Sequence, residues 1–227
     1  MFHKLKIKTI DMRRLPVYIL IDTSGSMFGE PIEAVKVGLN DMVATLRQDP
    51  YALETVWVSI ITFDREVKQV VPLTALEDLS IPDIKTPQSG PTHTGAALKM
   101  MREKYRQEVR LGNAQQKGDW LPLLFILTDG KPSDIQNYNS EVKLITQLPF
   151  SNIVACAAGP KALIEPLKQL TNNVFSLDTM DANSFKSYFK WVSQQVSLGG
   201  KSVGTVDANG STANALPPPP TEVNIVT

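Results

Sequence analysis

Three closely spaced side chains, Asp22, Ser24 and Ser26, offer one carboxylate and two hydroxyl oxygens. Gly25 lies between the two serines and allows the backbone to fold tightly there. Oxygen atoms gathered this densely are the ligands that a small divalent cation needs. Asp and Ser also cap ordinary turns, so this segment alone leaves two interpretations open, a metal site and a simple cap.

Two further segments bring oxygen-bearing side chains to the ends of expected elements. Asp22 ends a nearly continuous apolar run that begins at Leu15, which is typical of a central strand buried on both faces. Thr92 opens an expected helix, and Asp129 follows another apolar strand. Ligands of parallel sheets bind beyond the carboxyl ends of the strands, so we expect these three residues to gather at one edge.

Strand and helix patterns alternate along the chain. We expect strands over 15–21, 54–63, 67–73, 121–128, 151–158 and 173–177, and helices over 30–47, 96–109, 134–147, 161–171 and 181–197. The short link before 67–73 makes that strand antiparallel and places it at an edge. The pattern predicts an α/β fold, a doubly wound, mainly parallel sheet with one antiparallel edge strand and helices on both faces.

The composition limits the classes of partner. The 227 residues include 23 Lys and Arg against 23 Asp and Glu, so no net charge attracts nucleic acid or an anionic membrane. No apolar run reaches the ~18 residues of a membrane span, and residues 1–11 lack the apolar core of a secretion signal. The single cysteine, Cys156, excludes an internal disulfide and has apolar neighbours that predict burial. We expect a cytoplasmic protein that binds neither nucleic acid nor membrane.

One domain with two extensions accounts for the length. We expect the domain over 12–198, an N-terminal extension over 1–11 and a Gly/Ser/Pro-rich tail over 199–227. The first extension alternates in part, so an edge strand and an unordered leader both stay open. The end of the tail, 221–227, alternates like a strand. It either docks on this domain, adds to a partner's sheet or stays disordered.

The full set of oxygen-bearing residues resembles the metal-ion-dependent adhesion site of von Willebrand factor A domains. The resemblance rests on Asp22-x-Ser24-x-Ser26, Thr92 within Gly-Pro-Thr-His-Thr-Gly, and Asp129 within Thr-Asp-Gly, and covers about residues 12–198. It implies that Ser24 and Ser26 bind a metal ion through their hydroxyls and that Thr92 binds directly or through water. Asp22 and Asp129 then coordinate directly or hold bound waters. The expected ion is Mg²⁺, with Mn²⁺ or Ca²⁺ as alternatives, and an Asp or Glu of a partner protein fills the remaining position.

Three shorter stretches resemble the bacterial tellurium-resistance proteins of this family. They span 13–18, 29–34 and 215–220. This resemblance implies a role in a bacterial tellurium-resistance or stress-response system, where such proteins are associated with a protein kinase and a Ser/Thr phosphatase.

No pattern in the sequence supports catalysis. A serine hydrolase of this class needs a histidine late in the chain, but the two histidines are His3 and His93. The stretch 199–202 imitates the end of a phosphate-binding loop, yet residue 195 is Gln and no helix signal follows. We therefore expect a binding protein and not an enzyme. The alternative is a metal-assisted phosphoester hydrolase that activates water on the bound ion.

Several neighbouring residues are expected to have ordinary structural roles. His93 is expected to pack rather than to bind metal, and Thr94 and Lys131 to start a helix and to lie in a loop. The three tryptophans are expected in the core or at its edge; they are Trp57, Trp120 and Trp191.

Overall fold

The computed structural model describes residues 13–113, 117–202, 218–221 and 223–226. Within these residues one sheet has the strand order β3-β2-β1-β4-β5-β6-β7. The strands are β1 (Leu15–Asp22), β2 (Val56–Phe63), β3 (Val67–Ala75), β4 (Leu123–Thr128), β5 (Asn152–Ala158), β6 (Asn173–Leu177) and β7 (Val223–Ile225). The helices are η1 (Gly25–Met27), α1 (Glu30–Leu46), α2 (Pro50–Thr55), α3 (Thr94–Glu108), α4 (Ile135–Ile145), α5 (Ile164–Leu170) and α6 (Ala182–Ser202).

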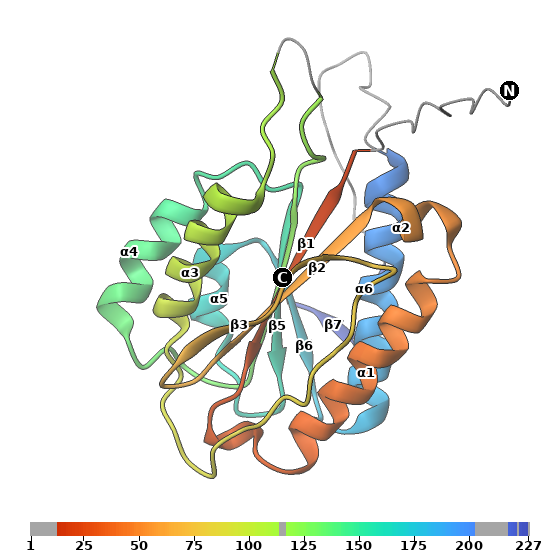
Figure 1. Cartoon of the computed structure of the whole chain (residues 1–227). Helices are drawn as coiled ribbons and strands as arrows, with labels where there is room; N and C mark the ends of the chain where they lie inside the picture. Colours follow the sequence, from red (N-terminus) through yellow and green to blue (C-terminus); the bar gives the residue numbers. More distant parts are fainter. Residues whose placement is uncertain (1–12, 114–116, 203–217, 222, 227) are drawn as a thin grey trace, which may run out of the picture.

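Helices cover both faces of the sheet. Figure 1 shows α1, α2 and α6 on one side and α3, α4 and α5 on the other. Alternate residues of β1 belong to the two resulting cores: Val17 and Ile19 pack with α1 and α6, whereas Tyr18 and Leu20 pack with α3 and α4. All eight residues of β1 are buried. The predicted doubly wound fold is confirmed, because a strand buried on both faces requires helices on both.

The strand order reverses beside β1. Strand β1 pairs in parallel with both β2 and β4, and the chain builds the sheet outward from it in both directions. The loops that follow β1 and β4 therefore turn to opposite faces of the sheet and leave space between them. This switch point is where open α/β sheets bind ligands.

Both outer strands are antiparallel to their neighbours. Strand β3 pairs with β2 in this way, as predicted. Strand β7 pairs with β6 at the other edge, in the register Leu177↔Val223. The side chain of Val223 is buried in the core that contains α1 and α6. The sheet therefore has one more antiparallel strand than the sequence predicted, and residues 223–225 dock on their own domain.

Two helical segments differ from the prediction. Asp49 and Pro50 end α1, as expected, but they also start α2, because the Asp49 carboxylate accepts a hydrogen bond from the Tyr51 N–H at 3.0 Å. An Asp cap followed by proline is a helix-start signal, and the predicted strand at residue 54 begins at Val56 instead. Helix α6 continues to Ser202. The helix predicted to end at residue 197 thus continues across Gly199 and Gly200, because glycine costs an established helix only about 1 kcal/mol per residue.

The remaining structural expectations are confirmed where the structure describes them. Cys156 is fully buried, and burial raises the pKa of its thiol. Trp191 is buried against Phe175, whereas Trp57 and Trp120 lie at the edge of the core. The N-terminal extension 1–11 and most of the tail lie outside the described residues. None of the described helices combines the length and the apolar character that a bilayer crossing requires.

Candidate metal site

The five residues predicted to bind metal lie on three loops at the carboxyl edge of the sheet. Asp22 is the last residue of β1, Ser24 precedes η1, and Ser26 lies within η1. Asp129 follows β4 directly, and Thr92 lies two residues before α3. The parallel pairing of β1 with β4, in the register Ile21↔Leu127, brings the ends of these strands together.

Asp22 is held in place by neutral hydrogen-bond donors. Its side chain is fully buried. One carboxylate oxygen accepts the Ser24 N–H at 2.8 Å, and the other accepts the hydroxyl of Thr128 at 2.5 Å. The Thr128 hydroxyl in turn accepts the N–H of Gly130 at 3.2 Å. Thr128 therefore fixes the orientation of Asp22 from the neighbouring strand.

The described residues give the Asp22 carboxylate no lysine or arginine as an ion-pair partner. Burial raises its pKa to about 6, and the charge of Asp129 raises that pKa further, whereas the hydrogen bonds from Thr128 and Ser24 lower it. Burial also raises the pKa of Asp129. Within the part of the chain that the structure describes, neither carboxylate forms an ion pair with a lysine or arginine.

The two serines connect the β1 loop to Asp129. The hydroxyl oxygens of Ser24 and Ser26 lie 3.2 Å apart, and the Ser26 hydroxyl donates a hydrogen bond to Asp129 Oδ1 at 2.8 Å. Ser24 and Asp129 are buried, whereas Ser26 is exposed. The cluster therefore reaches solvent at Ser26.

Thr92 lies beside the residue that follows Asp129. A Cβ atom placed on Gly130 would lie 3.0 Å from the Thr92 hydroxyl oxygen. Gly25 is needed for a related reason. A Cβ there would come within 2.6 Å of Ser89 Cα, so the close approach of the two loops requires glycine. The chain folds tightly here, as predicted, because Gly25 begins the 3-10 turn η1; its φ is not positive, so glycine is needed for the close approach rather than for a left-handed backbone.

The chemistry of these side chains fits a hard divalent cation. Among the described residues, no group of three or more His, Cys, Asp or Glu could hold a metal ion, so any ion here must also use hydroxyl oxygens. Two carboxylates and three hydroxyls form an all-oxygen set of the kind that Mg²⁺ binds. Zinc sites, in contrast, are usually built from nitrogen and sulfur ligands.

Other residues near the cluster have mainly structural contacts. The ring of His93 lies 3.1 Å from the carbonyl oxygen of Arg65, through Nδ1. Thr94 is the first residue of α3 and is buried, whereas Lys131 is exposed. The role of Thr128 was not predicted from the sequence. Its position immediately before Asp129, at the end of a buried strand, is the signal that could have indicated it.

The fold and this edge define a doubly wound α/β domain with an oxygen-rich cluster at its switch point. The model of the von Willebrand factor type A domain matches residues 17–190, and the chain belongs to that family. No curated protein sequence matches the chain.

Solved structures share the fold at low sequence identity. The chain is similar to proximal thread matrix protein 1 from the mussel byssus in crystal form 2, with a TM-score of 0.61, 16% identity and coverage of 82% of this chain and 48% of that chain. A structure of the same mussel protein with a zinc occupied MIDAS motif has a TM-score of 0.60, 16% identity and the coverages 82% and 48%. The pilus adhesin SpaC from Lactobacillus rhamnosus GG, in its open conformation, has a TM-score of 0.61, 14% identity and the coverages 82% and 30%. This chain therefore spans about half the length of the mussel structures that it matches.

Proposed function

We propose that this protein is a metal-dependent protein-interaction module. Asp22, Ser24, Ser26, Thr92 and Asp129 hold one divalent cation. Mg²⁺ is the expected ion, with Mn²⁺ or Ca²⁺ as alternatives. An Asp or Glu of a partner protein completes the coordination.

The observation that carries this proposal is the uncompensated carboxylate of Asp22. A fully buried carboxylate is normally paired with a cation or bound to a metal, because burial of an isolated charge is costly. Asp22 has only neutral hydrogen-bond donors, and the second carboxylate of the cluster, Asp129, raises its pKa further. A divalent cation would balance both charges at once.

The proposed ion leaves a position for an outside ligand. When bound, it supplies a Lewis-acidic coordination position. Three of the five ligands are neutral hydroxyls, so the two carboxylates balance the ion without giving the site a net negative charge. The site reaches solvent at Ser26, and a partner carboxylate can approach there.

The comparisons support this reading by analogy. One mussel structure is described with a zinc occupied MIDAS motif, and another similar protein is a pilus adhesin.

The narrower biological context is part of the same proposal. The stretches 13–18, 29–34 and 215–220 resemble the bacterial tellurium-resistance protein TerY. That resemblance suggests a protein kinase and a Ser/Thr phosphatase as partners in a bacterial stress response. The cytoplasmic location stays a prediction.

We infer that the module binds rather than catalyses. His93 is the only histidine among the described residues, and its ring contacts a backbone carbonyl. The Ser24 hydroxyl lies 3.2 Å from that of Ser26, which donates in turn to Asp129. A metal-assisted phosphoester hydrolase remains the second candidate, because the proposed ion could also activate water.

Titration calorimetry with Mg²⁺, Mn²⁺ and Ca²⁺ tests the proposal. We expect the wild type to bind one ion and Asp22→Ala to lose this binding. Asp181→Ala is the matched control, because Asp181 caps α6 through the Ser184 N–H and does not contact the cluster. Capture of partner proteins from the native cell should then fail with a chelator and with Asp22→Ala. If none of the three ions binds, the proposal is wrong. Phosphoester turnover that Asp22→Ala abolishes would favour the hydrolase.

A further inference from the structure

Thr92 is held differently from the other four proposed ligands. Its backbone, rather than its side chain, is bonded to the loop that carries Asp129. The Thr92 N–H donates to the hydroxyl oxygen of Ser133 at 3.0 Å, and the Ser133 N–H donates to the Thr92 carbonyl oxygen at 2.8 Å. One residue therefore fixes Thr92 on both sides of its Cα.

A second contact between the same two loops lies one helical turn further on. Helix α3 receives no side-chain cap from its own N-cap residue, His93. Its free N–H groups instead bind the carboxylate of Asp134: Gly95 N–H at 3.0 Å and Ala96 N–H at 2.8 Å. A Cβ on Gly95 would lie 2.4 Å from the backbone nitrogen of Tyr138, so α3 and the start of α4 touch closely. Asp134 thus fastens the helix that follows Thr92 to the loop that follows Asp129.

The turn between β2 and β3 fastens Thr92 to the first loop. The carbonyl oxygen of Asp64 accepts the His93 N–H at 3.1 Å, and the Asp64 carboxylate accepts the Thr23 hydroxyl at 2.9 Å. With Thr128 joining β4 to Asp22, hydrogen bonds connect all three loops: the β4 loop contacts the other two directly, and the Thr92 loop reaches the Asp22 loop through the β2–β3 turn. The spacing of the ligands is therefore set by residues that are not ligands.

We infer that Ser133 and Asp134 are positioning residues of this site and that they favour Mg²⁺ over Ca²⁺. The inference rests on the proposed function. Mg²⁺ requires near-ideal octahedral geometry at about 2.0–2.1 Å, whereas Ca²⁺ accepts flexible geometry at about 2.3–2.6 Å. A fixed distance between Thr92 and Asp129 suits the smaller, stricter ion. A loosened Thr92 weakens Mg²⁺ binding more than Ca²⁺ binding.

Calorimetric titration of the full chain with Mg²⁺ and with Ca²⁺ tests this inference. Partners that orient metal ligands typically change affinity by about 10-fold to 100-fold when removed. We expect Ser133→Ala to weaken Mg²⁺ by about 10-fold and Ca²⁺ by clearly less. Ser133→Thr keeps a hydroxyl and should retain most of the Mg²⁺ affinity. Ser140→Ala, an exposed serine on α4, is the matched control and should bind both ions as the wild type does.

Asp134→Ala gives an independent measurement of the same effect. It should lower the ratio of Mg²⁺ to Ca²⁺ affinity, whereas Asp181→Ala, which removes the cap of α6, should not. Amide hydrogen exchange without metal checks the contact itself: the Thr92 N–H should exchange about 10-fold faster in Ser133→Ala than in the wild type.

The outcomes separate the inference from the proposed function. If the wild type binds none of Mg²⁺, Ca²⁺ and Mn²⁺, the proposed function is wrong and the inference falls with it. If it binds Mn²⁺ but not Mg²⁺, only the inference is wrong. If the wild type binds Mg²⁺ and Ser133→Ala binds both ions with an unchanged ratio, only the inference is wrong. Unchanged Thr92 exchange in Ser133→Ala would also overturn it, whatever the metal result.

Discussion

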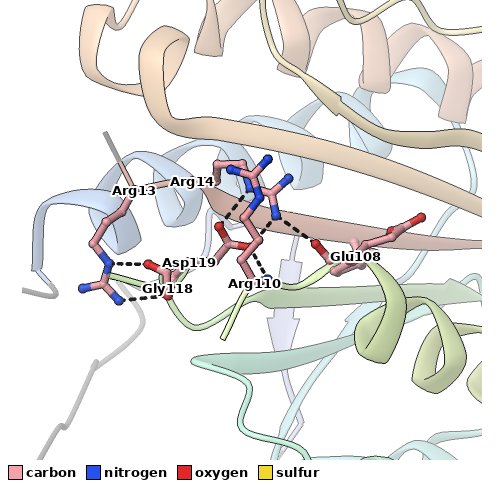
Figure 2. A network of polar contacts seen from close by, with 7 residues as sticks. Arg13, Arg14, Glu108, Arg110, Gly118 and Asp119 are labelled. Atoms are coloured by element: carbon pink, nitrogen blue, oxygen red, sulfur yellow. Dashed lines mark hydrogen bonds and ion pairs between the residues drawn. The ribbon is translucent and has the colours of Figure 1, made fainter. Parts of the chain in front are cut away.

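Two aspartates with shielded side chains lie near opposite ends of β1, and their hydrogen-bond partners differ in charge. Asp22, at the carboxyl end, has only neutral donors. Asp119, beside the amino end, is paired with Arg14 through two hydrogen bonds, Nε to Oδ1 at 2.9 Å and Nη2 to Oδ2 at 2.6 Å (Figure 2). The Asp119 side chain is only 3% exposed. Asp22 is fully buried and Asp119 is half-buried with a shielded side chain, and among the described residues only Asp119 is paired with an arginine.

The network around Asp119 is complete in itself. Arg14 also donates to the carbonyl oxygen of Glu108, at the end of α3, and the N–H of Arg110 donates to Asp119 Oδ2 (Figure 2). Arg13 donates to the carbonyl oxygens of Gly118 and Asp119. These contacts close the base of the loop between α3 and β4. The amino end therefore has a structural polar network that needs no ligand.

The two sites differ in how a shielded carboxylate is stabilised. Asp119, whose contacts are structural, is paired with Arg14 in bidentate geometry. Under the proposed function, the Asp22 carboxylate, which lies beside a second carboxylate and pairs with no arginine of the described residues, binds an ion from solution. Four measurements test this difference between the Asp22 and Asp119 sites.

The largest effect is expected at the amino end. Arg14→Ala leaves the buried Asp119 without its cation, and loss of one partner of a buried ion pair costs about 3–5 kcal/mol. Denaturant unfolding of the metal-free protein measures this loss of stability. Asp119→Asn combined with Arg14→Ala should recover part of it, because no charge is then left unpaired. A loss below about 1 kcal/mol would mean that the pair is not the main support of this end.

The second effect is metal-dependent stabilisation at the carboxyl end. An ion that binds only the folded state raises the free energy of unfolding by about 2.7 kcal/mol at a concentration of 100 Kd. Thermal unfolding with Mg²⁺ and with a chelator should show this shift in the wild type and not in Asp22→Ala. Arg14→Ala should keep the shift, because its contacts lie at the other end of β1. A shift that disappears in Arg14→Ala would show that the two ends are coupled.

A smaller effect, of opposite sign, is expected from Asp22→Asn without metal. The folded pKa of Asp22, about 6, is above the ordinary aspartate value, so folding favours the protonated form. The ionised carboxylate therefore destabilises the fold as pH rises through this window, and fully so above about pH 6. Removal of the charge should stabilise the metal-free protein by about 1–2 kcal/mol at pH 7, after the loss of one hydrogen bond.

Unfolding at several pH values checks this expectation. The advantage of Asp22→Asn should disappear near pH 4, and Mg²⁺ at pH 7 should reverse it in favour of the wild type. A metal-free Asp22→Asn protein that is less stable than the wild type at pH 7 would contradict the picture of an uncompensated charge.

The smallest effect is expected from Arg13. Its guanidinium lies 3.6 Å from the ring centroid of Trp120, and such contacts contribute about 0.5–1 kcal/mol at exposed sites. Arg13→Ala should therefore reduce stability by about 1 kcal/mol, and Arg13→Lys by less. Denaturant unfolding compares this loss of stability with that of Arg14→Ala. A larger loss in Arg14→Ala would show that the ion pair with Asp119, and not positive charge alone, stabilises the loop. Equal losses for the two alanine variants would contradict that ranking.

The order of elements could be predicted because it depends on local patterns. The apolar run before Asp22 and the alternation of strand and helix periods indicate the doubly wound sheet, and the sheet places Asp22 and Asp129 at one edge. Helix α2 was not predicted although Asp49 and Pro50 carry its start signal, because its last residues overlap the strand pattern that begins at residue 54. Strand β7 could not be decided, because three residues pair only where an edge is free to receive them.

The residues that hold the candidate ligands in place could not be predicted from the sequence. Thr128, Ser133 and Asp134 form hydrogen bonds to residues that lie between 38 and 106 positions away in the chain. Thr128 is marked by its place before Asp129 at the end of a buried strand, but nothing near Ser133 and Asp134 distinguishes them from ordinary turn and capping residues.

The sequence by itself determined which residue types could bind a hard cation and on which edge of the sheet they would lie, because strand periodicity and chain order are local properties. Only the tertiary structure decided which buried carboxylate is paired and which is not. Arg14 and Asp119 are 105 positions apart in the chain, and their pairing exists only because the fold brings the start of β1 beside the start of β4. The state of a buried charge depends on every group around it, and folding alone brings those groups together.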